Sequence, residues 1–500
     1  MTPDPAPVEP DGSAGAPVPA PAPPAEAAPP PPALRFSLVV TAFFALVVAA
    51  YIVGWPVLLP LLEGRATALD ALDEPARALR RLVEREMDLR EALQQAPAWE
   101  WWLYTGGGSP AEATREAREW YEELLEVDDS ARARLEHAIL AGESAGGPGV
   151  DEALQQWAPL TEPDERLAGW VQAAYLGAPL SRPEASALVA DIRATLGRTW
   201  FADILVLRLA QRRGDDETAR EAYAAIARRG AALSARLRLL VASGIAVIAL
   251  GAVIGAGAAW RRPGRGLLVG AAPLPPSWPA THGWALFVRG TGAPQVIIVT
   301  FFYIVRRETP LEPLVGMAAD LALFAWVWAY LRRRRLEPAS AFGLRTLRGS
   351  GTRLLGITVI LVALTLAADI LVDLAAPGLG MRSHWSDGFP EDLLWTSPWP
   401  LAVSSVDAIV WAPVVEELTF RGLLYGTLRR SLPLWSAATL SALVFVLPHQ
   451  YGAAGSVSVF CSGLLWAVAY ERTRSLWPPI LAHSANNAIS TVWALATLRW

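Results

Sequence analysis

The sequence contains no lysine and only one cysteine, Cys461. All 43 basic residues are therefore arginine, a choice that carries no obvious chemical advantage here. A single cysteine excludes an intrachain disulfide and a metal site built from several thiolates. The formal net charge of −5 gives no reason to expect nucleic acid as a partner.

Apolar residues, in contrast, are abundant. Hydrophobic residues make up 53% of the 500 positions, and the mean hydropathy is +0.29. The 22 tryptophans fit a membrane protein, because tryptophan collects at the bilayer interfaces. We therefore expect an integral membrane protein with a soluble part and the lipid bilayer as a partner.

The N-terminal region combines a proline-rich tail with a long apolar run. Residues 1–33 hold 13 of the 41 prolines and no basic residue, which predicts a disordered Pro/Ala-rich tail rather than a signal peptide. Residues 36–62 carry no charge and are long enough to span a bilayer. We assign the first transmembrane helix to residues 34–62.

Residues 64–232 change to Ala, Glu, Arg and Leu at helical spacing, which predicts a soluble all-helical domain inserted in the chain. The stretch GDDETAREAYAAIARRG, residues 214–230, faintly resembles the second helix of a tetratricopeptide repeat. No period of about 34 residues repeats, so a generic helical bundle is the favoured interpretation. Protein binding is one expected role for this domain.

Apolar segments then return to the end of the chain, and we divide them into transmembrane helices at 236–335 and a second membrane region at 350–498. With the first helix they number nine. The fold class is thus all-α: a polytopic transmembrane helical bundle with an inserted soluble helical domain and a disordered tail. Arginine clusters follow every second crossing, at 261–265, 332–335, 429–430 and 471–474.

These clusters predict the orientation of the chain. If all of them face the cytoplasm, the N-terminus is cytoplasmic and the helical domain lies on the other side of a bacterial inner membrane. Arg306 and Arg307 fall on the wrong side of this scheme.

Ionisable residues at membrane depth are costly, so each needs a partner or a function. Four isolated aspartates are expected near helix ends or paired within the bundle; they are Asp320, Asp369, Asp373 and Asp407. The other five lie within the last 90 residues; they are Glu416, Glu417, Arg421, His449 and His483.

The two adjacent glutamates cannot aim at one spot on a regular helix without distortion. Glu417 precedes Arg421 by four residues, the favourable order for an ion pair on one face. Glu416 has no such local partner and must meet a group on another helix. Pro413 is expected to bend or open the chain just before it.

Two later segments supply groups for Glu416 to meet. FVLPH places Phe445 and His449 one turn apart, and HSANN places His483 and Asn487 likewise. A glutamate and a histidine can activate water, while a second histidine and an asparagine amide stabilise an oxyanion. Alternatively, Glu416, His449 and His483 bind Zn²⁺ and leave a fourth position for water. The sequence leaves both mechanisms open.

The three motifs EExxxR (416–421), FxxxH (445–449) and HxxxN (483–487), in this order, resemble the CPBP intramembrane protease family. That family includes the Rce1-type CAAX prenyl endopeptidases and the bacterial Abi proteins. The resemblance covers about residues 400–495 and makes 350–498 a CPBP-like protease domain.

The resemblance implies a role for each motif residue. Glu416 and His449 would activate the attacking water, and His483 and Asn487 would stabilise the oxyanion. Supporting positions are Glu417, Arg421, Phe445 and Asn486. The expected activity is that of a CAAX-type metallo- or glutamic endopeptidase, with Zn²⁺ and metal-free water activation both open.

The expected substrate is a membrane protein or a lipid-anchored peptide. Two other interpretations compete with the protease: a non-catalytic membrane scaffold or chaperone of the same fold, and a proton-coupled transporter that uses the isolated aspartates. The intact motifs argue against the scaffold, and the absence of inverted repeats argues against the transporter.

Overall fold

The structure is a computed structural model that describes residues 35–52, 69, 72–94, 96–105, 108–157, 164–177, 180–261, 267–305, 312–381, 384–449 and 451–499. The described parts contain helices and their connections and no β-strand, which confirms the all-α prediction. The predicted tail at 1–33 and the second half of the first apolar run, from residue 53, lie outside the described residues.

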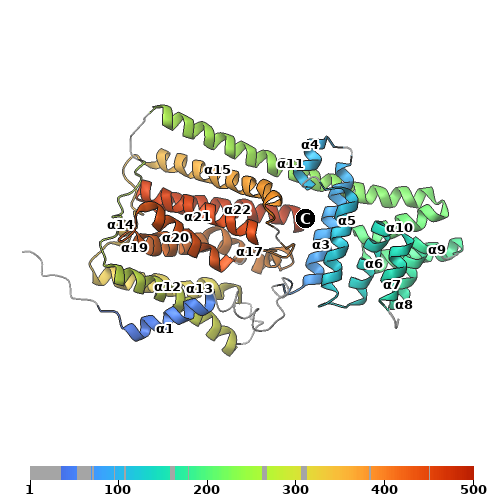
Figure 1. Cartoon of the computed structure of the whole chain (residues 1–500), viewed down its shortest axis with the longest axis horizontal. Helices are drawn as coiled ribbons and strands as arrows, with labels where there is room; N and C mark the ends of the chain where they lie inside the picture. Colours follow the sequence, from blue (N-terminus) through green and yellow to red (C-terminus); the bar gives the residue numbers. More distant parts are fainter. Residues whose placement is uncertain are drawn as a thin grey trace, which may run out of the picture.

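One half of the molecule is a bundle of apolar helices (Figure 1). Five helices are long and apolar enough to cross a membrane, and they begin at Asp216, Ala280, Glu312, Gly351 and Ala453. The bundle comprises α1 (Leu38–Ala49), α12 (Ala280–Val305), α13 (Val315–Arg333), α15 (Gly351–Ala375), α20 (Leu434–Val446), α21 (Ala453–Thr473) and α22 (Trp477–Ala494), together with α17 to α19 described below. The chain is an integral membrane protein.

Not every apolar segment expected from the sequence forms such a helix. Shorter apolar helices cover Leu38–Ile52 and Leu434–His449. The segment 399–425 is helical, but π-helical turns interrupt it. Within the described residues, the segment that carries the two glutamates is thus helical but irregular.

The other half, which we call the helical half, is built from shorter helices that pack around one core (Figure 1). Large buried side chains of this core include Tyr121, Trp170 and Phe201. The helices are α3 (Pro75–Leu93), α4 (Ala98–Thr105), α5 (Pro110–Leu124), α6 (Ala131–Ala145), α7 (Gly147–Gln155), α8 (Asp164–Val171), α9 (Arg182–Leu196) and α10 (Trp200–Arg213).

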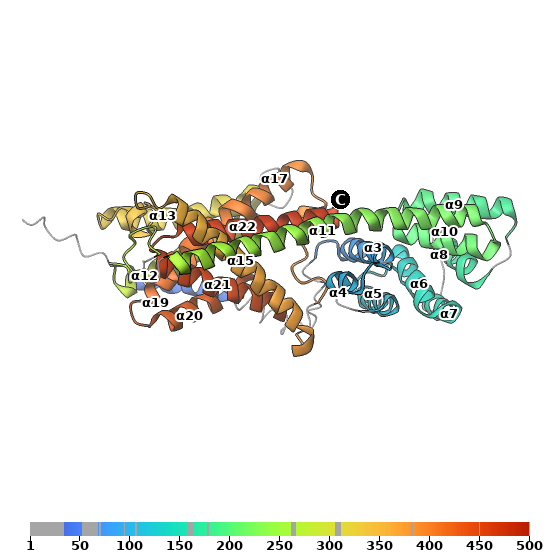
Figure 2. The same ribbon diagram turned by 90° about the horizontal axis from the view of Figure 1, so that it is seen from above.

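A single helix, α11 (Asp216–Arg261), joins the two halves (Figure 2). The sequence suggested a boundary between residues 232 and 236, but it contains no proline or glycine there that would end the helix. Its first half packs in the helical core through Ala222 and Ile226. Its second half packs on α15, where a Cβ added to Gly251 would lie 2.3 Å from Ala363 Cβ.

The loop between α15 and α17 braces the helical half against the bundle. Glu391, at the start of α16 (Glu391–Leu394), accepts hydrogen bonds from the backbone N–H groups of Asp73 (2.6 Å) and Glu74 (3.0 Å), just before α3. His384 Nε2 lies 2.9 Å from Glu123 Oε2 of α5. This loop leads into the helix that carries the two adjacent glutamates.

Candidate active site

The glutamates lie on a helical run that twice changes its pitch. After α17 (Pro398–Val406) comes a π-helix, Asp407–Trp411, then α18 (Ala412–Glu416) and a second π-helix, Glu417–Tyr425, before α19 (Gly426–Leu428). Pro413 follows the first π-helix directly, where its missing N–H is tolerated. Such wider turns are common at functional sites, and here the second one begins between Glu416 and Glu417.

Glu417 and Arg421 form a fully buried ion pair. Arg421 donates from NH1 to Glu417 Oε1 at 2.8 Å, and the side chains are 0% and 1% exposed for glutamate and arginine. The arginine also donates from NH2 to the Gly463 carbonyl at 3.2 Å. Its guanidinium stacks over the rings of Phe445 (4.2 Å) and Trp466 (5.2 Å), so packing and charge fix its position.

His483 of α22 lies between the two glutamates. Its Nδ1 is 3.0 Å from Glu417 Oε1, and its Nε2 is 3.7 Å from Glu416 Oε2. Glu416 therefore meets a group on another helix, and one imidazole contacts both carboxylates. The start of the π-helix at Glu417 supplies the distortion that this convergence needs.

The two glutamates differ in how far the surrounding protein covers them. The Glu417 side chain is 0% exposed, whereas that of Glu416 is 29% exposed. Of the two carboxylates, Glu416 is therefore the more accessible.

The Phe445 ring separates His449 from the cluster of Glu416, Glu417 and His483. His449 ends a 3₁₀ turn (Leu447–His449) that follows α20, and its Nδ1 is 2.8 Å from the Phe445 carbonyl. The Phe445 ring lies 4.7 Å from the ring of His449 and 6.0 Å from that of His483. Among the described residues, no contact joins His449 to Glu416.

His449 and His483 lie at a similar depth in the bundle because α20 is short. A regular helix that crossed the bilayer would carry His449 away from His483. At 13 residues, α20 is about 20 Å long, which is shorter than the hydrocarbon core. The chain therefore turns inside the bundle at His449, and Phe445 connects the two histidines in one layer.

Asn487 contacts the first π-helix. Its Nδ2 donates to the Ala408 carbonyl at 2.8 Å, which links α22 to the segment before Glu416. Asn486 is half-buried in the same helix. Of the predicted site residues, the structure brings Glu416, Glu417, Arg421, Phe445 and His483 into contact, and it places His449 and Asn487 at the margins.

The residues do not form the three-ligand zinc site that the sequence left open. Glu416 and His483 lie 3.7 Å apart, but His449, the third predicted ligand, makes no contact with Glu416, and no group of three His, Cys, Asp or Glu side chains that could hold a metal ion is found among the residues that the structure describes. Zinc in a catalytic site takes three protein ligands and a water.

Trp466 and Gly463 of α21 contact the predicted site residues, and sequence reasoning missed them. Trp466 stacks on the His483 ring at 4.3 Å with an interplanar angle of 22°, and Gly463 supplies the carbonyl for Arg421. Neither lies in a polar motif, so no signal marked them.

Asp320, predicted to pair within the bundle, accepts a hydrogen bond from Trp411 Nε1 at 3.2 Å.

Comparisons with known proteins find similarity in this part of the chain. The family described as Type II CAAX prenyl endopeptidase Rce1-like matches residues 398–489, which include the glutamates and both histidines. The chain is 27% identical over 122 residues to a protein of Bacillus subtilis (strain 168) named "Putative membrane peptidase YdiL". No solved structure matches the chain.

The reach of these similarities is limited to the C-terminal part. The alignment with the Bacillus protein covers 24% of this chain and 48% of the relative, so the chain spans about half the length of the curated relative it matches. The matched segment, the motifs within it and the membrane helices around it together show that this chain is a membrane protein whose C-terminal segment belongs to the CPBP family.

Proposed function

We propose that this protein is an intramembrane endopeptidase that hydrolyses a peptide bond of a membrane-associated protein or peptide. The observation that carries the proposal is the position of His483 between a reachable carboxylate, Glu416, and a buried one, Glu417. The family match and the peptidase named in Bacillus support the same class of activity.

The position of His483 suggests its role. Its Nδ1 lies 3.0 Å from Glu417 Oε1, and its Nε2 lies 3.7 Å from Glu416 Oε2. An N–H at Nε2 would point toward Glu416 and the reacting group, where it can stabilise an oxyanion.

Glu416 then acts as the general base. It takes a proton from a water molecule, whose oxygen attacks the carbonyl carbon of the scissile bond, and the carbonyl becomes a tetrahedral oxyanion. The N–H of His483 donates to this oxyanion. When the carbon–nitrogen bond breaks, Glu416 returns its proton to the leaving nitrogen, so that protons and atoms balance.

His449 and Asn487 support this chemistry. Because Nδ1–H of His449 donates to the Phe445 carbonyl, its Nε2 keeps a lone pair that can accept a hydrogen bond from the attacking water. Asn487 uses one amide hydrogen on the Ala408 carbonyl, which leaves the second hydrogen for the oxyanion or for substrate.

The arginines support a proposed orientation of the chain. Arg332 and Arg333 lie at the end of α13, Arg429 and Arg430 follow α19, and Arg472 lies near the end of α21. If these arginines face the cytoplasm, as the positive-inside rule favours, the helical half lies on the other side of the membrane. The helical half would gather or present the substrate.

The proposal is tested by mapping protein termini with mass spectrometry. Cells of the source organism would carry the native protein, Glu416→Ala, or Asp373→Asn as a matched change of a carboxylate elsewhere in the bundle, all at equal abundance. We expect a set of termini that Glu416→Ala abolishes and Asp373→Asn keeps. Identical termini in all three strains, with the deletion phenotype still rescued by Glu416→Ala, would favour a non-catalytic scaffold.

A further inference from the structure

The short helix α4 carries an apolar face that the helical half leaves uncovered. The side chains of Trp99, Trp102 and Leu103 are 66%, 51% and 43% exposed. They are spaced as i, i+3 and i+4 and therefore share one face of the helix. Glu100, to one side of this face, is only 6% exposed.

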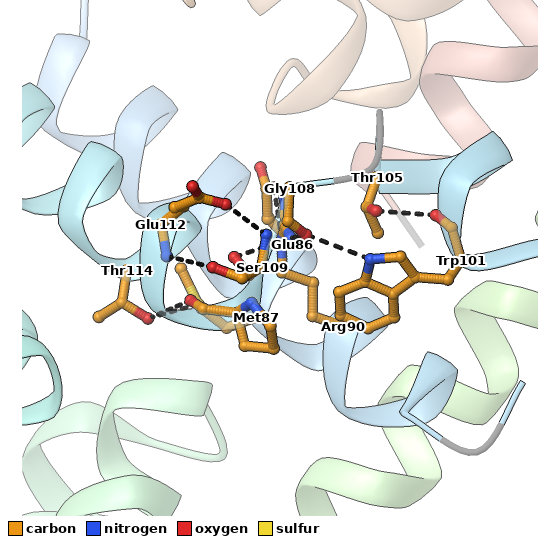
Figure 3. Close-up of polar contacts among 10 residues, drawn as sticks. Glu86, Met87, Arg90, Trp101, Thr105, Gly108, Ser109, Glu112 and Thr114 are labelled. Carbon is orange, nitrogen blue, oxygen red and sulfur yellow. Dashed lines mark hydrogen bonds and ion pairs between the residues drawn. The ribbon is translucent and has the colours of Figure 1, made fainter. Parts of the chain in front are cut away.

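Hydrogen bonds fix which face of α4 points outward (Figure 3). Trp101 Nε1 donates to the Gly108 carbonyl at 3.2 Å, and the Thr105 hydroxyl donates to the Trp101 carbonyl at 2.7 Å. Arg90 of α3 donates to the same Gly108 carbonyl at 3.0 Å and stacks on the Trp101 ring at 5.8 Å. Because Trp101 is held inward, Trp99 and Trp102 cannot rotate into the core.

The level of α4 relative to the bilayer follows from α11. Glu100 forms an ion pair with Arg238, which is the last charged residue before the apolar stretch of α11. That stretch, residues 239–260, is about 33 Å long and thus matches the hydrocarbon core. It starts at Leu239, which is 71% exposed, and ends at Trp260, which is 90% exposed.

Arg238 therefore lies at the headgroup layer, and the ion pair holds α4 at the same level. Both views show α4 beside α11 at the end of the helical half that faces the bundle (Figures 1 and 2). A tryptophan-rich apolar face at headgroup level is the kind of surface that rests in a membrane interface.

We propose that α4 is a membrane-surface anchor, which inserts Trp99, Trp102 and Leu103 into the bilayer interface on the side of the helical half. The anchor holds the helical half down against the membrane. This inference rests on the geometry of α4 and α11, and it stands whether or not the protein is a protease.

Depth-dependent fluorescence quenching tests the anchor. Since Cys461 is the only cysteine, full-length protein with Cys461→Ser can carry one new cysteine, either Trp99→Cys or the control Tyr223→Cys. Tyr223 is 46% exposed on the same helix α11, about 22 Å before Arg238. Each variant would be labelled with an environment-sensitive dye and reconstituted into phosphatidylcholine vesicles with or without lipids brominated near the headgroup.

We expect several-fold stronger quenching by brominated lipid at position 99 than at position 223, together with a blue-shifted emission at 99 only. Equal and weak quenching at both positions would overturn the anchor. A blue shift at 99 without lipid quenching would also overturn it, because another protein surface, such as a second copy of the chain, would then cover α4. Exchange of the α3 amides, unchanged between the two variants, verifies that the helical half remains folded.

Discussion

The ion pair of Glu417 and Arg421 gives a quantitative prediction about the site. Arg421→Met removes the arginine but keeps an apolar side chain that can pack against Phe445 and Trp466. At 2.8 Å and an effective dielectric constant of about 20, the pair attracts by about 6 kcal/mol, and desolvation offsets part of this. Breaking a buried pair at one partner costs about 3–5 kcal/mol, which is the expected loss for Arg421→Met.

The double variant Glu417→Gln with Arg421→Met separates charge from packing. It leaves no uncompensated carboxylate, and the glutamine oxygen still accepts from His483 Nδ1–H, so we expect it to recover about 2 kcal/mol or more of the loss. Unfolding in mixed micelles with a rising fraction of dodecyl sulfate, followed by near-UV circular dichroism, measures both variants. A double variant as unstable as Arg421→Met alone would refute the electrostatic explanation.

Two further predictions concern the helical half. Burial raises the pKa of Glu84 from 4.5 to about 7, and the nearby Glu136 carboxylate is the next cause of this shift. The protonated carboxyl therefore stabilises the folded state below pH 4.5. This contribution to stability is lost as the pH rises through 7. Glu84→Gln should therefore leave the free energy of unfolding nearly unchanged at pH 4.5 and raise it by about 3 kcal/mol at pH 8. Thermal unfolding curves that shift equally at both pH values would contradict this prediction. Glu391→Ala should speed hydrogen exchange of the Asp73 and Glu74 amides by about fivefold. This change corresponds to a loss of about 1 kcal/mol, which is typical of a helix N-terminal cap. An unchanged exchange rate would show that the loop does not brace α3.

The local pairings of the site were predictable from the sequence. The four-residue spacing predicted the contact between Glu417 and Arg421, and the absence of a local partner predicted that Glu416 meets another helix. Both follow from helical periodicity, which is a property of the sequence itself.

The features that depend on tertiary packing were not predictable. The adjacent glutamates indicated that the helix must be distorted, but they did not indicate that the distortion is a π-helix that begins at Glu417. Trp466 lies in an ordinary apolar segment, so its stacking on His483 became visible only in the fold. The sequence divided the chain between residues 232 and 236, and the fold shows that one helix, α11, runs across this point.

The central claim is that Glu416 carries the chemistry and Glu417 carries the architecture. The most direct test compares Glu416→Gln with Glu417→Gln in reconstituted protein, using a substrate found by terminus mapping and measuring both the cleavage rate and the unfolding free energy. We predict that Glu416→Gln lowers the rate by about 100- to 10,000-fold with little change in stability, as expected for loss of a general base. Cleavage retained by Glu416→Gln, in protein that is as stable as the native chain, would contradict the account.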